Sequence, residues 1–540
     1  MKISFIEIRK FRSIDICKIN IAELNGIVGQ NNSGKSAIIR ALNAFFNIEK
    51  ELDYFKDGSH AYSSKSIPKI TIGFTDINVD SLDEFKFNNV VQLQLVFQKN
   101  GKHSYKIFNS NKKFVNVSRE QLDVILKSLA FVYIPPNRSP KQLKWDEDAL
   151  IKKLIIEYLK IETQNRDTLS PKFKSATDYL EKKALKKISK DIKSFYSLRN
   201  TFEFHLEFNK DANFLSFLNE IEMKIDEMGV THSLNDCGTG LQSLTIIALY
   251  RVLAKIKHQN IVLAIEEPET NLHPQAQREF VNSILDDTDG VSQLFLTTHS
   301  TVLIDNLKHQ NISLVRKVHD DKRGFKSVVF KISDDFFDKY NLQEFLYYQF
   351  HNYRNSDFFF ANYVILVESK NDAEVVKHLA GRSNLDLDLL GISLINFDGV
   401  KNLPYPFHII KELDLPYMVI LDKDYFLPYQ NDDLHSSRDN QGLPKYKSEF
   451  KGDILLNDFV GTNRNQQRLL TNFRNSHTKA MNQLLERGVL CMKYCLEMDL
   501  LGSSKAVESM CDQLNIYGSN RTKKYLLLEN HKAIKKIQNT

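Results

Sequence analysis

Tryptophan, cysteine and proline are scarce in this sequence, which has one Trp, five Cys and 12 Pro in 540 residues. The cysteines are odd in number and lack the spacing of zinc ligands, which excludes a disulfide framework and a structural zinc site. We therefore expect a reduced, cytoplasmic setting. No segment reaches the roughly 18 apolar residues of a membrane span, and the first residues alternate apolar with polar side chains instead of forming the apolar core of a signal peptide. We expect a soluble protein with no membrane partner.

A strong charge of either sign is also missing. The formal net charge is +6, a mild excess that permits nucleic-acid binding without requiring it. Hydrophobic residues make up 42% of the chain and charged residues 26%, a composition too apolar for a disordered protein. Because 540 residues exceed the usual size of one hydrophobic core, we expect two to four domains.

A phosphate-binding loop lies near the start of the chain. The stretch "GQNNSGKS", Gly29 to Ser36, follows a strand-like run and opens an amphipathic helix, as the pattern G-x-x-x-x-G-K-[ST] requires. Gly29 and Gly34 let the backbone wrap phosphates, Lys35 reaches the β- and γ-phosphates, and Ser36 can bind Mg²⁺. We also assign the loop residues Asn31, Asn32 and Ser33 to this nucleotide site.

A second α/β stretch, from about 235 to 300, supplies acids to the same site. The strand "IVLAIEE" delivers Glu266, suited to hold Mg²⁺ through water, and Glu267, suited to orient or deprotonate an attacking water. The strand "LFLTTHS" ends on His299. This histidine either contacts the γ-phosphate or is a satisfied polar group at a strand end.

Acidic residues follow apolar strands in the last third of the chain. Glu368 ends "YVILVES", and Asp422 and Asp424 follow "YMVIL". Because open α/β sheets build their sites at the carboxyl ends of parallel strands, we expect these acids to meet at one edge. Carboxylate oxygens favour Mg²⁺, Mn²⁺ or Ca²⁺ over zinc. Asp372 has two interpretations, a further metal ligand or a cap of the helix that follows.

Two motif sets carry a resemblance to known proteins. "EEPETNLHP" resembles the ABC-type ATPase heads of the SMC and RecF-like superfamily, and "NDCGTGLQSL" resembles a degenerate signature loop, with Gly240 and Gln242 before a helix. The set E-(x3)-D…G…D-x-D resembles the Toprim fold of topoisomerases, primases and nucleases. In this order the motifs resemble the OLD (overcoming lysogenization defect) family of nucleases, which includes the Gabija nuclease subunit and retron-associated effectors. One departure is Ser369, where the family usually has Gly.

The resemblance implies an α/β fold: an ABC/SMC-like ATPase head with a helical insertion, followed by a C-terminal Toprim domain. We expect the first part of the head at 1–144, the insertion at 145–230, the second part of the head at 231–345 and the Toprim domain at 346–540. The insertion is rich in Lys, Glu and Leu. It is either a dimerisation or DNA-contacting arm or a solvated helix pair that packs on its own domain.

The resemblance also implies roles for the acids. Glu368, Asp372, Asp422 and Asp424 would be metal ligands, with either Glu497 or Asp499 as a further ligand. A late lysine, for which Lys524 is preferred over Lys523, would steady the scissile phosphate. The implied cofactors are ATP, with Mg²⁺ or Mn²⁺ at both the ATPase and the Toprim sites.

The predicted function is that of an ATP-binding, metal-dependent DNA endonuclease in antiphage defence, cutting one or both strands under the control of the ATPase head. The alternative is a non-nucleolytic, RecF-like DNA-binding ATPase with an inactive Toprim module. Retention of all the acids favours the nuclease. DNA and further copies of this chain, as a homodimer or homotetramer, are the expected partners. A helicase, a retron reverse transcriptase with its msDNA, or no further partner all remain open.

Overall fold

The computed structural model describes residues 1–528 except 78, 99–101, 137, 139–150, 152–153, 156–178, 199, 209–220, 258–259, 286–290, 322, 352–355 and 453–454. It divides into two compact units, 1–334 and 335–540. No helix in the described ranges is both long and apolar enough to cross a membrane.

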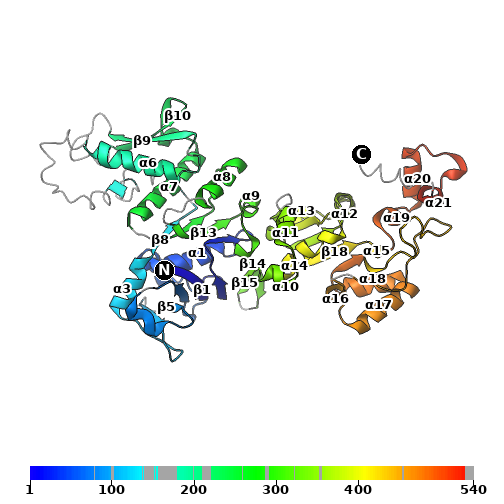
Figure 1. Ribbon diagram of the computed structural model, residues 1–540, viewed down its shortest axis with the longest axis horizontal. Helices are drawn as coiled ribbons and strands as arrows, with labels where there is room; N and C mark the ends of the chain where they lie inside the picture. The colour runs from blue at the N-terminus through cyan, green and yellow to red at the C-terminus, as the bar shows by residue number, and fades with distance from the viewer. Residues whose placement is uncertain are drawn as a thin grey trace. The chain divides into compact units, whose positions relative to one another are not determined.

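The first unit is built on a sheet of twelve described strands in the order β7-β6-β5-β4-β1-β2-β15-β14-β3-β13-β12-β8 (Figure 1). Strands β14, β3, β13, β12 and β8 run parallel, and β7 to β2 form an antiparallel wing. The strands are β1 (Lys2–Phe11), β2 (Ile14–Asn20), β3 (Leu24–Val28), β4 (Lys69–Thr75), β5 (Val91–Phe97), β6 (His103–Phe108), β7 (Phe114–Asn116), β8 (Ala130–Ile134), β12 (Ile261–Glu266), β13 (Val291–Thr298), β14 (Ile312–Asp320) and β15 (Gly324–Lys331).

The parallel strands are apolar because helices cover them. All six residues of β12 are buried, as expected for a central strand of a parallel sheet. Helix α1 packs on β1, β4, β8, β12 and β13, and α7 packs on β8 and β12. The helices of this unit are α1 (Lys35–Phe46), α2 (Ile48–Lys56), α3 (Arg119–Ser128), α6 (Lys186–Phe195), α7 (Thr239–Lys257), α8 (Pro274–Leu285) and α9 (Thr301–Ile304).

The predicted helical insertion, 145–230, contains more than helices. Its described part includes α6 but also the strands β9 (Phe202–Phe208) and β10 (Ile221–Glu227), which pair with β11 (Val230–Ser233) in an antiparallel sheet. The stretches "FEFHLEF" and "IEMKIDE" alternate apolar with polar residues, which is the period of a half-buried strand. The prediction of helices missed this alternation because the segment is rich in Lys and Glu.

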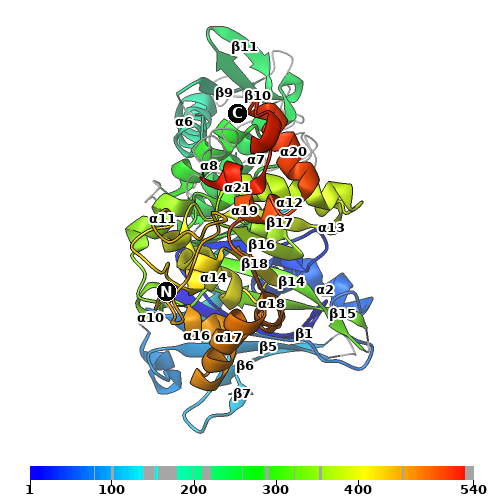
Figure 2. The ribbon, with the colours of Figure 1, turned by 90° about the vertical axis from the view of Figure 1, so that its right-hand side faces the viewer.

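The second unit has a four-stranded parallel sheet in the order β17-β16-β18-β19 (Figure 2). Helix α12 packs on β16 and β17, and α14 packs on β16. The strands are β16 (Tyr363–Val367), β17 (Ile392–Asn396), β18 (Tyr417–Leu421) and β19 (Val489–Cys491). The helices are α10 (Phe336–Lys339), α11 (Glu344–His351), α12 (Lys370–Arg382), α13 (Leu387–Leu390), α14 (Pro404–Glu412), α15 (Lys423–Phe426), α16 (Leu456–Phe459), α17 (Asn463–Asn475), α18 (His477–Leu485), α19 (Leu496–Leu500), α20 (Ser504–Gln513) and α21 (Lys523–Leu528).

Candidate nucleotide site and acidic site

The phosphate-binding loop joins β3 to α1. Its two glycines have backbone φ of 142° at Gly29 and 109° at Gly34, values that side chains rarely tolerate. A Cβ at Gly29 would also collide with the carbonyl oxygen of Val315 on β14, and one at Gly34 with the hydroxyl of Ser327 on β15. The glycines are therefore required by both the backbone conformation and the close approach of the neighbouring strands.

Lys35 is the first residue of α1, and its side chain turns back into the loop. Its Nζ donates to the carbonyl oxygens of Gly29 and Gln30, each at 3.0 Å. Burial lowers the pKa of this ammonium to about 8, although the nearby acids Glu267, Glu269 and Glu266 act in the opposite direction. A buried cation among loop carbonyls is poised to bind a phosphate group.

Glu266, the last residue of β12, is held at both carboxylate oxygens. The Ser36 hydroxyl donates to Oε2 at 2.7 Å, and the Tyr133 hydroxyl, from β8, donates to Oε1 at 2.9 Å. Only 3% of Glu266 is exposed. Ser36 and Glu266, each predicted to serve Mg²⁺, are thus in direct contact, and their metal role stays a prediction. Tyr133 was absent from the predicted site.

Glu267 has an unusual backbone. Its φ is 46°, in the left-handed region, and it precedes Pro268, which further narrows the backbone conformations available to it. Such a conformation costs on the order of 1 kcal/mol and persists only where its surroundings impose it. The Glu267 N–H donates to the Thr297 carbonyl oxygen at 2.9 Å, and its Oε1 lies 3.8 Å from His299 Nε2. Burial and nearby Lys35 lower the pKa of His299, against the opposing effect of Glu267.

The predicted signature residues begin α7. Gln242 is buried and donates to the carbonyl oxygens of Leu234 and Cys237, so it braces the loop before the helix. A Cβ at Gly240 would collide with the carbonyl oxygen of Asn271, in the loop after β12. Replacement of Gly240 would therefore disturb the fold of its own chain. An added Cβ at Gly238 has no atom within 4 Å, so a substitution there would test contact with a second copy without disturbing the fold.

The acids of the second unit gather at the carboxyl edge of its sheet. Glu368 follows β16, and Asp422 follows β18, which is the direct neighbour of β16 in the sheet. Asp424 lies in the first turn of α15. Gly399, with φ 97°, donates its N–H to the Glu368 carbonyl oxygen at 3.1 Å and thereby ties the loop after β17 to the same edge.

Mutual repulsion marks these acids as neighbours. Burial raises the pKa of Glu368 to about 7, with further contributions from Asp424, Asp372 and Glu497. Burial and the charge of Glu368 raise the pKa of Asp422 to about 8, and the other three acids add to the shift. Within the described ranges no group of three or more His, Cys, Asp or Glu side chains is arranged to hold a metal ion. The metal role of these residues therefore stays a prediction.

Asp372 caps α12. Its Oδ2 accepts from both the N–H and the hydroxyl of Ser369 at 2.8 Å, and its own N–H donates to the Ser369 hydroxyl at 3.3 Å. This is a reciprocal capping box, with Asp in the third helical position. The departure from glycine at Ser369 thus has a structural reason, and one oxygen of Asp372 is already engaged.

The later candidates differ in their surroundings. Asp499 accepts from the backbone N–H groups of Lys493 and Tyr494, so its carboxylate closes a local turn. Glu497 is the one whose charge contributes to the pKa shifts of the other acids. Lys524 lies at the start of α21, and no described contact joins it to the acids.

One lysine and one arginine near the two sites were not predicted from the sequence as site residues. The charge of Lys451 opposes the rise in the pKa of Glu368 that burial causes. The Nζ of Lys451 lies 3.4 Å from the carbonyl oxygen of Asp424. Arg138, after β8, contacts the backbone of Glu266 and Glu267. Neither belongs to a contiguous motif. The strand-to-loop position of "YIPPNR" was the one signal that could have pointed to Arg138.

Known families match both units. The family model "AAA ATPase domain" matches residues 1–133 and 131–304, more than half of the chain, and "Overcoming lysogenization defect protein-like, TOPRIM domain" matches residues 359–424. The chain therefore belongs to the family of this AAA ATPase domain, and its second unit carries an OLD-like Toprim domain. The predicted fold class, an ATPase head followed by a Toprim domain, is confirmed.

The named relatives of this chain are distant from it in sequence. The OLD nuclease of Thermus scotoductus is 23% identical over 455 residues, which cover 78% of this chain and 81% of that protein. Endonuclease GajA of Bacillus cereus is 23% identical over 519 residues, covering 78% and 74%. Among solved structures, an SMC head bound to the C-terminal winged-helix domain of ScpA is 14% identical, with a TM-score of 0.41 over 62% of this chain and 98% of that one.

Proposed function

We propose that this protein is a metal-dependent DNA endonuclease whose second unit cleaves DNA under the control of an ATP-binding first unit. The observation that carries the proposal is the set of acids at one sheet edge, of which Glu368 and Asp422 have strongly raised pKa values. The names of its relatives, OLD nuclease and endonuclease GajA, support the same activity.

The donor set fits a hard divalent cation, Mg²⁺ or Mn²⁺. Oxygen ligands suit these ions, and a cation would offset the repulsion that raises the two pKa values. We assign the ligands to Glu368, Asp422, Asp424 and Glu497, with Asp372 contributing its second oxygen. Bound cations would supply a nucleophilic water and stabilise the departing 3′-oxygen.

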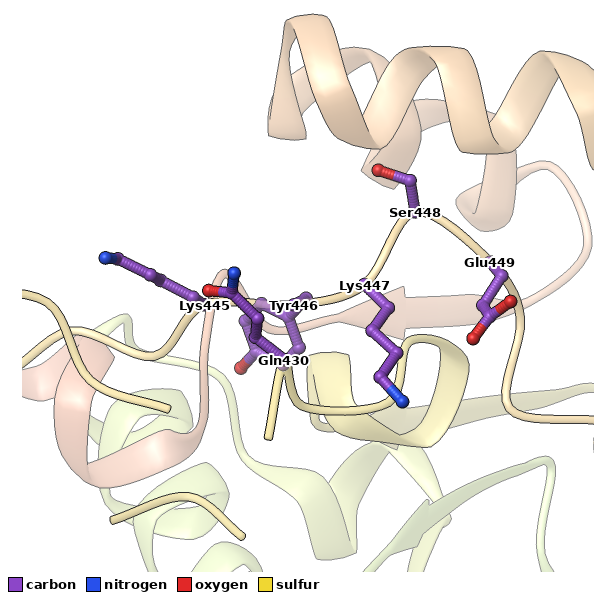
Figure 3. A pocket seen from close by; sticks show the side chains of 6 residues that line it. All are labelled: Gln430, Lys445, Tyr446, Lys447, Ser448 and Glu449. Carbon is purple, nitrogen blue, oxygen red and sulfur yellow. The ribbon is translucent and has the colours of Figure 1, made fainter. Parts of the chain in front are cut away.

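DNA would approach through an open pocket of about 730 Å³ beside the acids. The lining residues are Gln430, Lys445, Tyr446, Lys447, Ser448 and Glu449. Figure 3 shows Lys445 and Lys447 pointing away from each other on one extended segment, where each can neutralise a phosphate. Tyr446 stacks on Tyr429 with ring centroids 5.4 Å apart, a surface on which a base can stack.

The charge of the acids reaches this pocket. Burial, followed by Tyr429 and Asp424, raises the pKa of the Tyr446 hydroxyl. Tyr446, which lines the pocket, therefore lies within electrostatic reach of Asp424. Lys451, beside Glu368 and Asp424, joins Lys524 as a candidate for steadying the scissile phosphate.

In the first unit, ATP with Mg²⁺ would occupy the loop Gly29–Ser36, with Glu266 as the metal's outer ligand and Glu267 as the base. A dimer in which the loop before α7, where Gly238 is exposed, faces a second copy follows from the same proposal, as does a role in antiphage defence. All five cysteines are free, which suits a cytoplasmic protein.

The test is cleavage of supercoiled and linear DNA by the purified protein in Mg²⁺ or Mn²⁺, with and without ATP. The wild type is expected to cut, and Asp422→Asn is expected to lose more than about 100-fold in rate, because even outer-shell partners of a metal are worth 10–100-fold. Asp386→Asn is the matched control, since Asp386 caps α13 and Asn caps equally well. Equal cleavage by wild type and Asp422→Asn would refute the proposed site. Intact ATPase activity without cleavage would favour the non-nucleolytic alternative.

A further inference from the structure

Arg138 joins two separate parts of the first unit through three residues. Its Nη1 donates to the carbonyl oxygen of Glu266 at 2.9 Å, its Nη2 to that of Glu267 at 2.6 Å, and its Nε to the hydroxyl of Ser243 at 2.6 Å. Glu266 ends β12 and Glu267 follows it, and Ser243 lies in the first turns of α7, where it is 2% exposed. One guanidinium therefore joins a strand end to a helix that is distant in sequence.

Arg138 donates to two main-chain carbonyls and one hydroxyl, all uncharged acceptors, which separates its role from charge pairing. A guanidinium offers five N–H donors in a rigid fork, so it can fix two successive carbonyls at once. Burial lowers the pKa of Arg138 to about 10, against the opposing effect of Glu269, Glu267 and Glu266. A desolvated arginine is costly unless its donors are satisfied, and here all three nitrogens donate hydrogen bonds.

Glu267, whose carbonyl oxygen Arg138 holds, also has a strained backbone. Glu267 has φ 46° and precedes Pro268, so its left-handed backbone needs external support. Its N–H is held by Thr297, and its carbonyl oxygen accepts from Arg138 and from the N–H and hydroxyl of Thr270. The direction in which the Glu267 side chain leaves the backbone depends on this conformation.

We propose that Arg138 is a positioning residue for ATP hydrolysis, which holds the Glu267 backbone in its left-handed conformation and fixes the start of α7 against the same turn. The inference rests on the proposed function of the first unit. Arg138 acts through the protein in this arrangement, because its described hydrogen bonds join it to Glu266, Glu267 and Ser243. Its loss therefore affects the chemical step more than affinity.

The experiment compares full-length Arg138→Met with wild type by steady-state ATP hydrolysis, by direct titration with a fluorescent ATP analogue and by thermal melting. We expect kcat to fall on the order of 100-fold, the loss typical of a catalytic group misplaced by about 1 Å. The analogue Kd is expected to change by less than about 3-fold, since the phosphate loop is untouched. Arg138→Lys is expected to recover only part of kcat, because an ammonium cannot reproduce the fork.

Arg251→Met is the matched control for the loss of a buried arginine. Arg251 also lies on α7, is 2% exposed and donates from Nη1 to the carbonyl oxygen of Phe195 at 2.7 Å, far along the helix from Ser243. It is expected to lower the melting temperature while kcat per folded molecule stays within about 3-fold of wild type.

The outcomes separate this inference from the function on which it rests. Wild-type kcat in Arg138→Met, or a loss no greater than that in Arg251→Met, would overturn it. So would a wild type that binds ATP without hydrolysing it, a result that leaves the endonuclease proposal standing. A wild type that binds no nucleotide would overturn the nucleotide part of the proposed function itself. Whether the wild type cleaves DNA tests the endonuclease part of the proposed function.

Discussion

The two candidate sites differ in how far their polar groups are already paired. In the nucleotide site Glu266 is held by Ser36 and Tyr133, and the backbone of Glu267 by Arg138 and Thr297. In the second unit burial, followed by the charges of neighbouring acids, raises the pKa values of Glu368 and Asp422 instead. The nucleotide site is organised by its own hydrogen bonds, whereas the acidic site needs positive charge from a ligand. The first should tolerate the absence of its ligand better than the second.

The largest effect is expected from Lys35→Ala. Its ammonium is the one charged donor inside the phosphate loop among the described contacts, and hydrogen bonds to charged groups are worth about 1.5–3 kcal/mol each. Loss of the contacts with two phosphates should weaken ATP binding by more than about 100-fold in a filter or fluorescence titration. Lys331→Ala is the control, because Lys331 also donates to a main-chain carbonyl, that of Asn20. Tight ATP binding by Lys35→Ala would remove the nucleotide-site assignment.

A smaller effect is expected from Tyr133→Phe. The change removes one of the two donors to Glu266 and leaves the ring in place, so ATP hydrolysis should slow by about 10-fold, the lower range for a residue that orients a metal-binding acid. Tyr105→Phe is the matched control, since the Tyr105 hydroxyl donates to the Phe45 carbonyl oxygen elsewhere in the same unit. If both variants hydrolyse ATP at the same rate, Tyr133 does not organise Glu266.

The acidic site should make stability depend on pH and on cations. Glu368 and Asp422 have folded-state pKa values of about 7 and 8, above their ordinary values, so the folded protein keeps protons that the unfolded chain has released. Without divalent cations the free energy of unfolding should therefore fall as pH rises from about 4 toward 8. Mn²⁺ should raise the melting temperature more at pH 8 than at pH 6. A profile unchanged in Asp422→Asn would count against the shared repulsion.

The smallest effect concerns the cap of α12. Ser369→Ala removes the hydroxyl that bonds Asp372 and should cost about 1 kcal/mol of stability, whereas Ser369→Gly should cost only a few tenths. Chemical denaturation measures the difference. If the glycine variant also cleaves DNA at the wild-type rate, Ser369 is confirmed as a structural departure rather than a catalytic one. Equal stability of all three proteins would contradict the capping role.

Contiguous motifs were predictable from the sequence, and residues brought together by the fold were not. "GQNNSGKS" places its glycines and Lys35 within eight positions, so local pattern was sufficient. Arg138 and Ser243 are about a hundred residues apart and meet only because α7 packs on β8 and β12. No periodicity in the sequence carries that contact.

The acidic site shows the same division. The acids after β16 and β18 were predictable, because strand ends of a parallel sheet share an edge. The opposite surroundings of Glu497 and Asp499, two residues apart on α19, were not, since they depend on which way the short helix faces. The strands β9 and β10 were missed because charged residues on their exposed faces resemble those of a solvated helix.

If the acids of the second unit bind the cations that cleave DNA, calorimetric titration of nucleotide-free protein with Mn²⁺ should detect this binding. Asp422→Asn should abolish it or weaken it by more than about 10-fold, and Lys35→Ala should leave it unchanged. Mn²⁺ binding of equal strength in wild type and Asp422→Asn would contradict the proposed role of these acids.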